Sequence, residues 1–173
     1  MRRLWVLFAV VLAVFGCADS HQLVRNAPNS GGKISPGDTI YIAVSRDGVY
    51  GAKTYFGSGQ MTSQILQSAF LKRVRNVQTA GGAQTFDDSL QAARKANAKY
   101  LVFPTILQWE DRATEWSAIP DKVEVKVEVV ATSNGQVLES VLIQGKSGIA
   151  TFGGDHPQDL LPKPITAFVF GLF

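Results

Sequence analysis

The chain has 173 residues, of which 46% are hydrophobic and 18% are charged, and its formal net charge is +3. This length suits one compact domain, and the apolar fraction excludes an intrinsically disordered chain. The single Cys excludes an internal disulfide, and one Cys with two His offers too few side chains for a metal site built from cysteine or histidine. We therefore expect no metal and no cofactor.

The first 16 residues have the layout of a secretory signal peptide. Arg2 and Arg3 form a short basic segment, residues 4–15 are an uninterrupted apolar run, and Gly16 follows. The run is too short for a membrane-spanning helix, which needs about 20 residues. The segment Val14-Phe15-Gly16-Cys17 resembles the lipobox of bacterial lipoproteins. The resemblance implies cleavage before Cys17 and acylation of this residue with chains such as palmitate; the alternative is an ordinary signal peptide with a coincidental cysteine.

The residues after the cysteine indicate a location and a tether. By the sorting rule of bacterial lipoproteins, Ala18 implies the outer membrane, with the protein facing the periplasm. Residues 17–38 are rich in Gly, Pro, Ser and Asn, and we expect an acylated Cys followed by a flexible tether. Cleavage removes two of the 17 basic residues and leaves the chain nearly neutral against its 14 acidic residues, which argues against a nucleic-acid partner. Residues 39–173 are expected to form a single periplasmic domain.

The first half of this domain predicts alternating strands and helices. Residues 39–44 are apolar on both faces, as in a strand buried inside a sheet. A turn and a glycine-rich loop follow, and apolar residues then recur at helical spacing from Met61 to Val74. We expect a short strand around Val77, a break at Gly81-Gly82, and a second helix with Thr85 as its N-cap.

The second half predicts an antiparallel meander and a closing helix. Residues 100–107 form a strand in which Pro104 requires a sheet edge or a bulge, and a further strand is expected from Trp109 to Trp116. Residues 123–129 alternate between valine and charged residues, and Asn134-Gly135 predicts a type I′ turn before the returning strand. Four apolar residues at helical spacing close the chain: Ile165, Phe168, Val169 and Leu172. The predicted fold class is α/β (α+β), a mixed sheet of about five strands with three helices packed mainly on one face.

Two groups of polar residues are candidates for chemistry. Glu110, Asp111 and Glu115 form an acidic cluster, and His156 directly follows an aspartate, as an Asp-His pair would. The sequence pairs no serine or cysteine nucleophile with His156, and carboxylates at a solvated strand end are ordinarily surface charges. An envelope hydrolase that uses the acidic cluster or His156 is therefore the alternative to a binding protein.

Three segments spread over the domain carry a family resemblance. They are Asp47-Gly48-Val49-Tyr50-Gly51 after the first strand, Ala98 to Val102, and Asp155 to Leu161 before the last helix. Together they resemble an uncharacterised bacterial lipoprotein family, defined only as a domain of unknown function, over about residues 39–172. This resemblance implies no reaction, cofactor or catalytic residue. More distantly, the order of elements is similar to TolB N-termini, curli-secretion lipoproteins and lipoprotein activators of cell-wall synthases, which implies binding to other envelope proteins.

We therefore expect a non-catalytic binding or adaptor module of the cell envelope. Loops held by a rigid sheet carry function more often than core residues do. The expected partner surface joins the loop after the first strand to the two tryptophans that flank the acidic cluster. Its residues are Asp47, Gly48, Tyr50, Gly51, Tyr55, Trp109 and Trp116.

Overall fold

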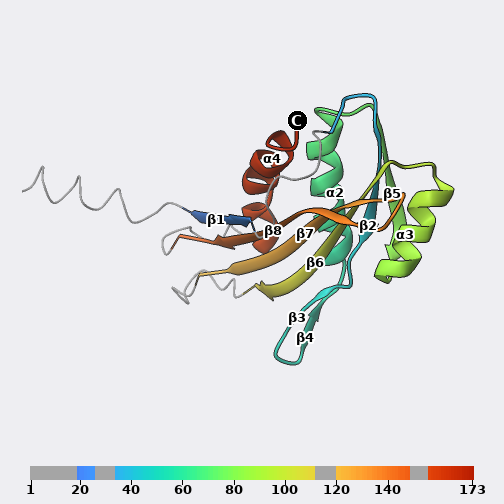
Figure 1. Ribbon diagram of the computed structural model, residues 1–173. Helices are drawn as coiled ribbons and strands as arrows, with labels where there is room; N and C mark the ends of the chain where they lie inside the picture. Colours follow the sequence, from blue (N-terminus) through green and yellow to red (C-terminus); the bar gives the residue numbers. More distant parts are fainter. Residues whose placement is uncertain (1–18, 26–33, 112–119, 149–155) are drawn as a thin grey trace, which may run out of the picture.

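A computed structural model describes residues 19–25, 34–111, 120–148 and 156–173 (Figure 1). The signal peptide, Cys17, Glu115 and Trp116 lie outside the described residues. The elements in chain order are β1 (Ser20–Arg25), β2 (Thr39–Val44), β3 (Gly48–Tyr50), β4 (Lys53–Tyr55), α2 (Ser58–Leu71), β5 (Asn76–Ala83), α3 (Phe86–Lys95), β6 (Tyr100–Glu110), β7 (Lys122–Ala131), β8 (Val137–Lys146), the 3-10 helix η1 (Pro157–Leu160) and α4 (Pro162–Phe170).

A mixed sheet forms the centre of the molecule, which confirms the predicted fold class. Its strand order is β1-β8-β7-β6-β2-β5, so the described residues form six strands in this sheet where about five were expected. β2 runs parallel to β5 and β6. β6, β7 and β8 pair antiparallel as a meander that contains the expected hairpin of β7 and β8, and β1 pairs antiparallel with β8. Helices α2 and α4 cover one face, and α3 packs on the other face against β2 and β6 (Figure 1).

The buried strand β2 separates two apolar cores. Ile40 and Ile42 pack with α2 and α4, whereas Tyr41 and Ala43 pack on the side of α3. Because successive side chains of a strand point to opposite faces, a strand that is covered on both sides must be apolar at every position. This explains why residues 39–44 read as one continuous apolar run.

The segment that we expected to be a tether contains a strand. Residues Ser20 to Arg25 pair antiparallel with β8, from Ser20 opposite Lys146 to Arg25 opposite Val141. Ile34 is also buried, and its N–H donates to the carbonyl of Leu172 over 2.9 Å. The prediction failed here because β1 is mostly exposed and polar, and its order comes from the backbone groups of β8, which composition does not reveal.

Two glycine-rich segments are strands where a loop and a break were expected. Residues 48–50 and 53–55 form the two-stranded sheet β3–β4, and Gly81-Gly82 lie within β5. Pro104 behaves as predicted, since β2 pairs only with residues 100–102 of β6 and leaves that side of Pro104 open. Thr85 also caps α3 as predicted, because its side chain accepts a hydrogen bond from the Asp88 N–H over 3.2 Å.

The connection between β7 and β8 differs from the predicted type I′ turn. That turn needs positive φ at both central residues, and only Gly135 has it, at 75°. The Ala131 N–H donates to the Gln136 carbonyl over 2.9 Å and closes a longer loop. The Asn134 side chain accepts from the Gln136 N–H over 3.0 Å. Asparagine is therefore used here for its side-chain acceptor and not for its tolerance of positive φ.

The separate strand expected from Trp109 to Trp116 is also a wrong prediction at its start. Trp109 and Glu110 continue β6 without interruption and pair with Val123 and Lys122 of β7. A bulge between Ile106 and Gln108 shifts the register and lets β6 remain paired to its end. The continuous valine ladder of β7 favours one long partner strand.

Candidate functional site

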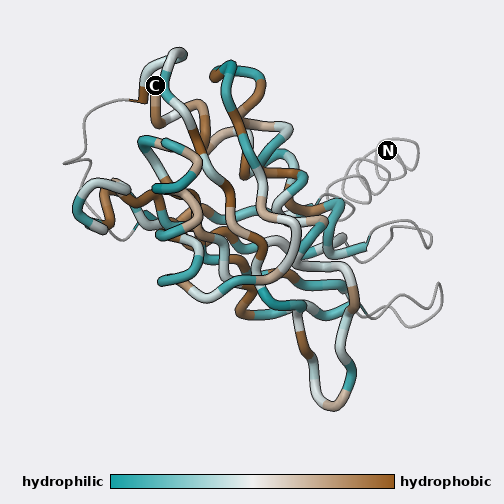
Figure 2. Tube along the Cα trace, turned by 90° about the vertical axis from the view of Figure 1, so that its right-hand side faces the viewer, coloured by the Kyte–Doolittle hydropathy of each residue, from teal (hydrophilic) through white to brown (hydrophobic). Residues whose placement is uncertain are grey.

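The β3–β4 hairpin projects from the body of the domain and carries exposed apolar side chains. It extends beyond the end of the sheet in both views (Figures 1 and 2). Val49 is 55% exposed, Tyr50 40%, and Phe56, just after β4, 87%. Exposed apolar groups of this size cost solvation free energy, and several of them on one projection make it a candidate interaction surface. We call Val49, Tyr50 and Phe56 the hairpin patch.

Two of the predicted surface residues hold the base of the hairpin in place. A Cβ on Gly48 would lie 2.5 Å from the Cβ of Trp109, so only glycine allows this close approach of β3 to β6. The Gly48 N–H donates to Ser58 Oγ over 2.8 Å, and Asp47 Oδ1 accepts from the Gly59 N–H over 3.0 Å. Asp47 and Gly48 thus fix the hairpin to the start of α2.

Trp109 does not belong to the surface. The sequence predicted it as part of the partner surface, but it is 2% exposed and packs in the core on the side of α2 and α4. Trp109 pairs with Val123 of β7 near the end of β6, and the alternation of side chains along the strand directs its ring into that core. An aromatic residue near a strand end is commonly a core-edge residue, and the pleat decides this case.

Tyr55, Asp111 and His156 meet at the base of the hairpin. The Tyr55 hydroxyl donates to the Asp111 carbonyl over 3.3 Å, and the Asp111 N–H lies 3.4 Å from the same hydroxyl oxygen. Asp111 Oδ1 is 3.5 Å from His156 Nδ1, and both side chains are partly exposed. The structure therefore joins two candidates that lie far apart in the sequence.

The remaining acidic candidate is a buried residue. Glu110 is 3% exposed, and the Gln108 side-chain amide donates to its Oε1. Glu115 lies outside the described residues. Within the described part of the chain, no Ser, Thr or Cys side chain hydrogen-bonds to His156, and no group of three or more His, Cys, Asp or Glu residues is arranged to hold a metal ion. Among the described residues, these side chains join elements to one another and do not form a complete catalytic set.

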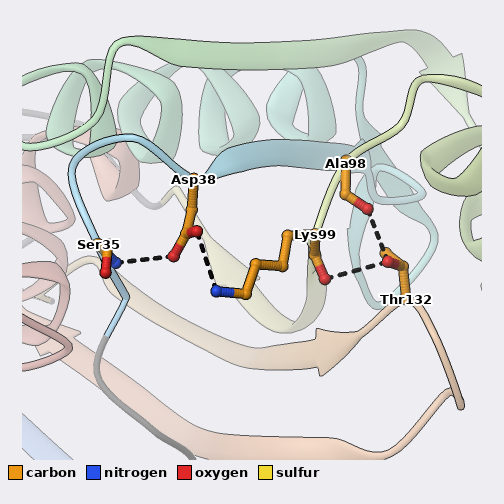
Figure 3. A network of polar contacts seen from close by, with 5 residues as sticks. All are labelled: Ser35, Asp38, Ala98, Lys99 and Thr132. Carbon is orange, nitrogen blue, oxygen red and sulfur yellow. Dashed lines mark hydrogen bonds and ion pairs between the residues drawn. The ribbon is translucent and has the colours of Figure 1, made fainter.

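A third polar cluster lies at the end of the sheet where β2 and β6 begin (Figure 3). Asp38 Oδ1 accepts from the Lys99 ammonium over 3.0 Å, and Asp38 Oδ2 accepts from the Ser35 N–H over 2.8 Å. The Thr132 hydroxyl oxygen lies 2.6 Å from the Ala98 carbonyl and 3.0 Å from that of Lys99. The hydrogen bond from Lys99 to Asp38, with a smaller effect of Tyr100, raises the pKa of Lys99. This cluster connects the entry of β2 to the entry of β6 and to the loop after β7.

Sequence reasoning missed two of the three residues of the hairpin patch. Neither Val49 nor Phe56 was predicted to belong to the partner surface, because both stand among turn residues and glycines. The available signal was that both are large apolar residues outside every periodic apolar run, so neither belongs to a pattern that predicts a core position.

In the described residues no helix has both the length and the apolar character needed to span a membrane.

The fold and the site define a mixed α/β domain with a rigidly mounted apolar hairpin. The chain belongs to the family described as Domain of unknown function (DUF4823), whose model matches residues 32–172. This confirms the predicted membership of a family of unknown function. No match was found among curated proteins.

Several solved structures have a similar fold. A chain of the PelC dodecamer from Paraburkholderia phytofirmans is 16% identical with a TM-score of 0.66, and the match covers 88% of this chain and 98% of that one. Protein XCC0632 from Xanthomonas campestris is 13% identical with a TM-score of 0.52 and coverages of 84% and 88%. Lipoprotein GNA1162 from Neisseria meningitidis is 13% identical with a TM-score of 0.45 and coverages of 78% and 97%. At such identities the first two similarities show the fold alone, and the third, with a TM-score below 0.5, supports no conclusion.

Proposed function

We propose that this protein is a lipid-anchored adaptor of the bacterial envelope that binds a protein partner through the β3–β4 hairpin. Acylation at Cys17 holds it in the outer membrane, with the domain in the periplasm. The observation that carries the binding role is the hairpin patch, three exposed apolar side chains on one projection. The sequence supports the anchor through the segment Val14-Phe15-Gly16-Cys17.

The contacts that fix the base of the hairpin support a role in binding. Its base is fixed by Gly48 against Trp109 and by Asp47 at the start of α2. A surface that is already held in its binding geometry loses little conformational entropy when a partner docks. Aromatic side chains such as Tyr50 and Phe56 supply large contact area for few rotatable bonds, and such residues dominate the free energy of many interfaces.

The partner is either another envelope protein or a second copy of this chain. The chain from Paraburkholderia phytofirmans with the similar fold forms a dodecamer. Self-assembly is therefore one form that the adaptor role takes in our proposal. The two kinds of partner differ in the mass of the complex that the hairpin forms.

Site-specific photo-crosslinking tests the hairpin as the binding surface. A photoreactive amino acid at Phe56 is expected to give a discrete crosslinked species in membranes, and the substitutions Val49→Asp and Tyr50→Ala should remove it. The matched control is Leu71, which is 52% exposed at the opposite end of α2. The purified protein alone should give the same species if the partner is a second copy. Equal crosslinking from both positions, or none from Phe56, would contradict the proposal.

Metabolic labelling tests the lipid anchor. The mature protein should incorporate labelled palmitate and sediment with outer membranes, and Cys17→Ser should lose both properties. The test is clean because Cys17 is the single cysteine of the chain. Label retained by the variant would show that the acyl chain is elsewhere.

The Asp111–His156 contact favours a second candidate, an envelope hydrolase. An aspartate that orients a histidine is one part of several kinds of hydrolytic site. Here Asp111 Oδ1 lies 3.5 Å from His156 Nδ1. Turnover of envelope ester, amide or glycosidic substrates by the purified protein, lost in both Asp111→Asn and His156→Gln, would favour this candidate. The adaptor proposal expects no such turnover.

A further inference from the structure

The start of the described chain is fixed to the end of the sheet, close to the proposed lipid anchor. Asp19 Oδ1 accepts a hydrogen bond from the Gly148 N–H over 3.1 Å, and β1 begins at the next residue. Six residues of β1 then pair in register with β8. Only Ala18 separates Asp19 from Cys17.

This connection keeps the folded domain close to the lipid anchor. Consecutive Cα atoms are 3.8 Å apart, so the Cα of Cys17 lies within about 8 Å of the Cα of Asp19. A flexible tether over residues 17–38 would instead allow the domain to move tens of ångströms from the membrane. Because β1 belongs to the sheet, the spacer between acyl chains and folded domain is one residue long.

The end of the sheet next to Asp19 carries two lysines side by side. Ser20 of β1 lies opposite Lys146 of β8, and Lys146 lies opposite Lys122 of β7. Like charges directly opposite on neighbouring strands repel each other. In the described part of the chain neither lysine forms an ion pair, although Lys126, further along β7, pairs with Glu128. Glu110 of β6 lies opposite Lys122 on its other side, whereas the strands next to Lys146 place only Ser20 and Lys122 opposite it. A lipid phosphate would give Lys146 the anion that neither neighbouring strand supplies.

We propose that the domain rests directly on the phospholipid leaflet that holds its anchor, with the end of the sheet formed by Ser20, Lys122 and Lys146 facing the lipid headgroups. The ammonium groups of the two lysines then contact lipid phosphates, and the sheet is held at a fixed orientation by the short connection. This inference rests on the proposed acylation of Cys17. The hairpin base packs on Trp109 of β6, at this end of the sheet but three strands away from β1, to which the anchor connects.

Depth-dependent quenching of fluorescence tests whether this end of the sheet rests on the membrane. The acylated full chain has no free thiol besides an introduced one, so Ser20→Cys and Val137→Cys each accept a single fluorophore and keep both lysines. Ser20 lies opposite Lys146, at the other end of β8 from Val137, so the two positions are about 30 Å apart. The proteins are placed in vesicles of phosphatidylethanolamine and phosphatidylglycerol that contain a lipid with a quencher near its headgroup. We expect at least twofold stronger quenching at position 20 than at position 137.

A spacer insertion distinguishes the short connection from the anchor itself. Ten Gly and Ser residues inserted between Ala18 and Asp19 preserve the Asp19–Gly148 contact and give an r.m.s. reach of about 18 Å. The protein with the insertion should still float with vesicles, while quenching at position 20 falls to the level of position 137. Equal quenching at the two positions in floated protein without the insertion, or a difference that survives the insertion, would overturn the inference. Failure of the parent protein to float would count against acylation of Cys17 instead.

Discussion

Thr132 and Lys99 show how burial decides what a polar contact contributes. The Thr132 hydroxyl is buried against two carbonyl oxygens, those of Ala98 and Lys99. The Lys99 side chain is more than half exposed, and its ammonium pairs with Asp38 over 3.0 Å. A buried carbonyl that loses its donor keeps its full desolvation cost, whereas an exposed ion pair exchanges protein contacts for water.

We therefore expect Thr132→Val to lower the free energy of unfolding by about 1–3 kcal/mol and Lys99→Met by less than about 1 kcal/mol. Because Asp38 raises the pKa of Lys99 above its ordinary value of 10.5, the ion pair stabilises the fold at neutral pH. This stabilisation is lost as the pH rises through the folded-state pKa, so the difference between wild type and Lys99→Met should shrink above about pH 10.5. Urea denaturation from neutral to alkaline pH measures both effects. A larger loss for Lys99→Met than for Thr132→Val would contradict this interpretation.

At the scale of elements, Arg25 attaches β1 to the rest of the fold. Its guanidinium lies 3.8 Å from the carboxylate of Glu139 on β8 and 5.9 Å from the ring centroid of Phe168 on α4. The Glu139 side chain is only 6% exposed, so its charge depends on nearby compensation. Arg25 thus links three elements from an otherwise exposed edge strand.

Arg25→Met should lower the free energy of unfolding by about 2 kcal/mol, because it leaves the Glu139 carboxylate buried without its cation. Adding Glu139→Gln should restore part of this loss, and a double-mutant cycle by urea denaturation measures the coupling. The control is Lys126→Met, which breaks the more exposed pair with Glu128 and should cost less than about 1 kcal/mol. Equal costs for the two single substitutions would show that burial of Glu139 does not matter.

Across the whole molecule, one sheet supports two cores. Phe70 of α2 packs in the core shared with α4, and Leu101 of β6 packs in the core beneath α3. The neighbouring residues Tyr100 and Val102 of β6 face the first core. Neither core can be lost without exposing the other face of the same strands. The domain should therefore unfold as one cooperative unit.

Phe70→Ala and Leu101→Ala should each lower the stability by about 2–5 kcal/mol in a single transition. The buried Trp109 reports on the first core by fluorescence, measured with Trp116→Phe to remove the other mature tryptophan. Far-UV circular dichroism reports on the whole fold. The two urea curves should coincide in both variants, and a separate transition seen by circular dichroism alone in Leu101→Ala would contradict cooperative unfolding.

The candidate site was only partly predictable. Turn-forming residues indicated a loop from Asp47 to Gly51, because turn preferences depend on only a few neighbouring residues. Sequence reasoning could not show that Trp109 faces the core or that Phe56 faces water, since each depends on the register of a strand or the position of a neighbouring element. The meeting of Asp111 and His156 also depends on how β6 and η1 pack, which no local pattern encodes.

The sequence by itself determined the class of the fold and membership of the DUF4823 family, because hydrophobic periodicity and local motifs are properties of short segments. The length of the spacer behind the proposed anchor was decided only in the tertiary structure. Residues 20–25 have the polar composition of a linker, and they become a strand because β8 presents unpaired backbone groups at the edge of the sheet. Backbone pairing between distant segments depends little on side-chain composition, so it appears only when the whole sheet is assembled.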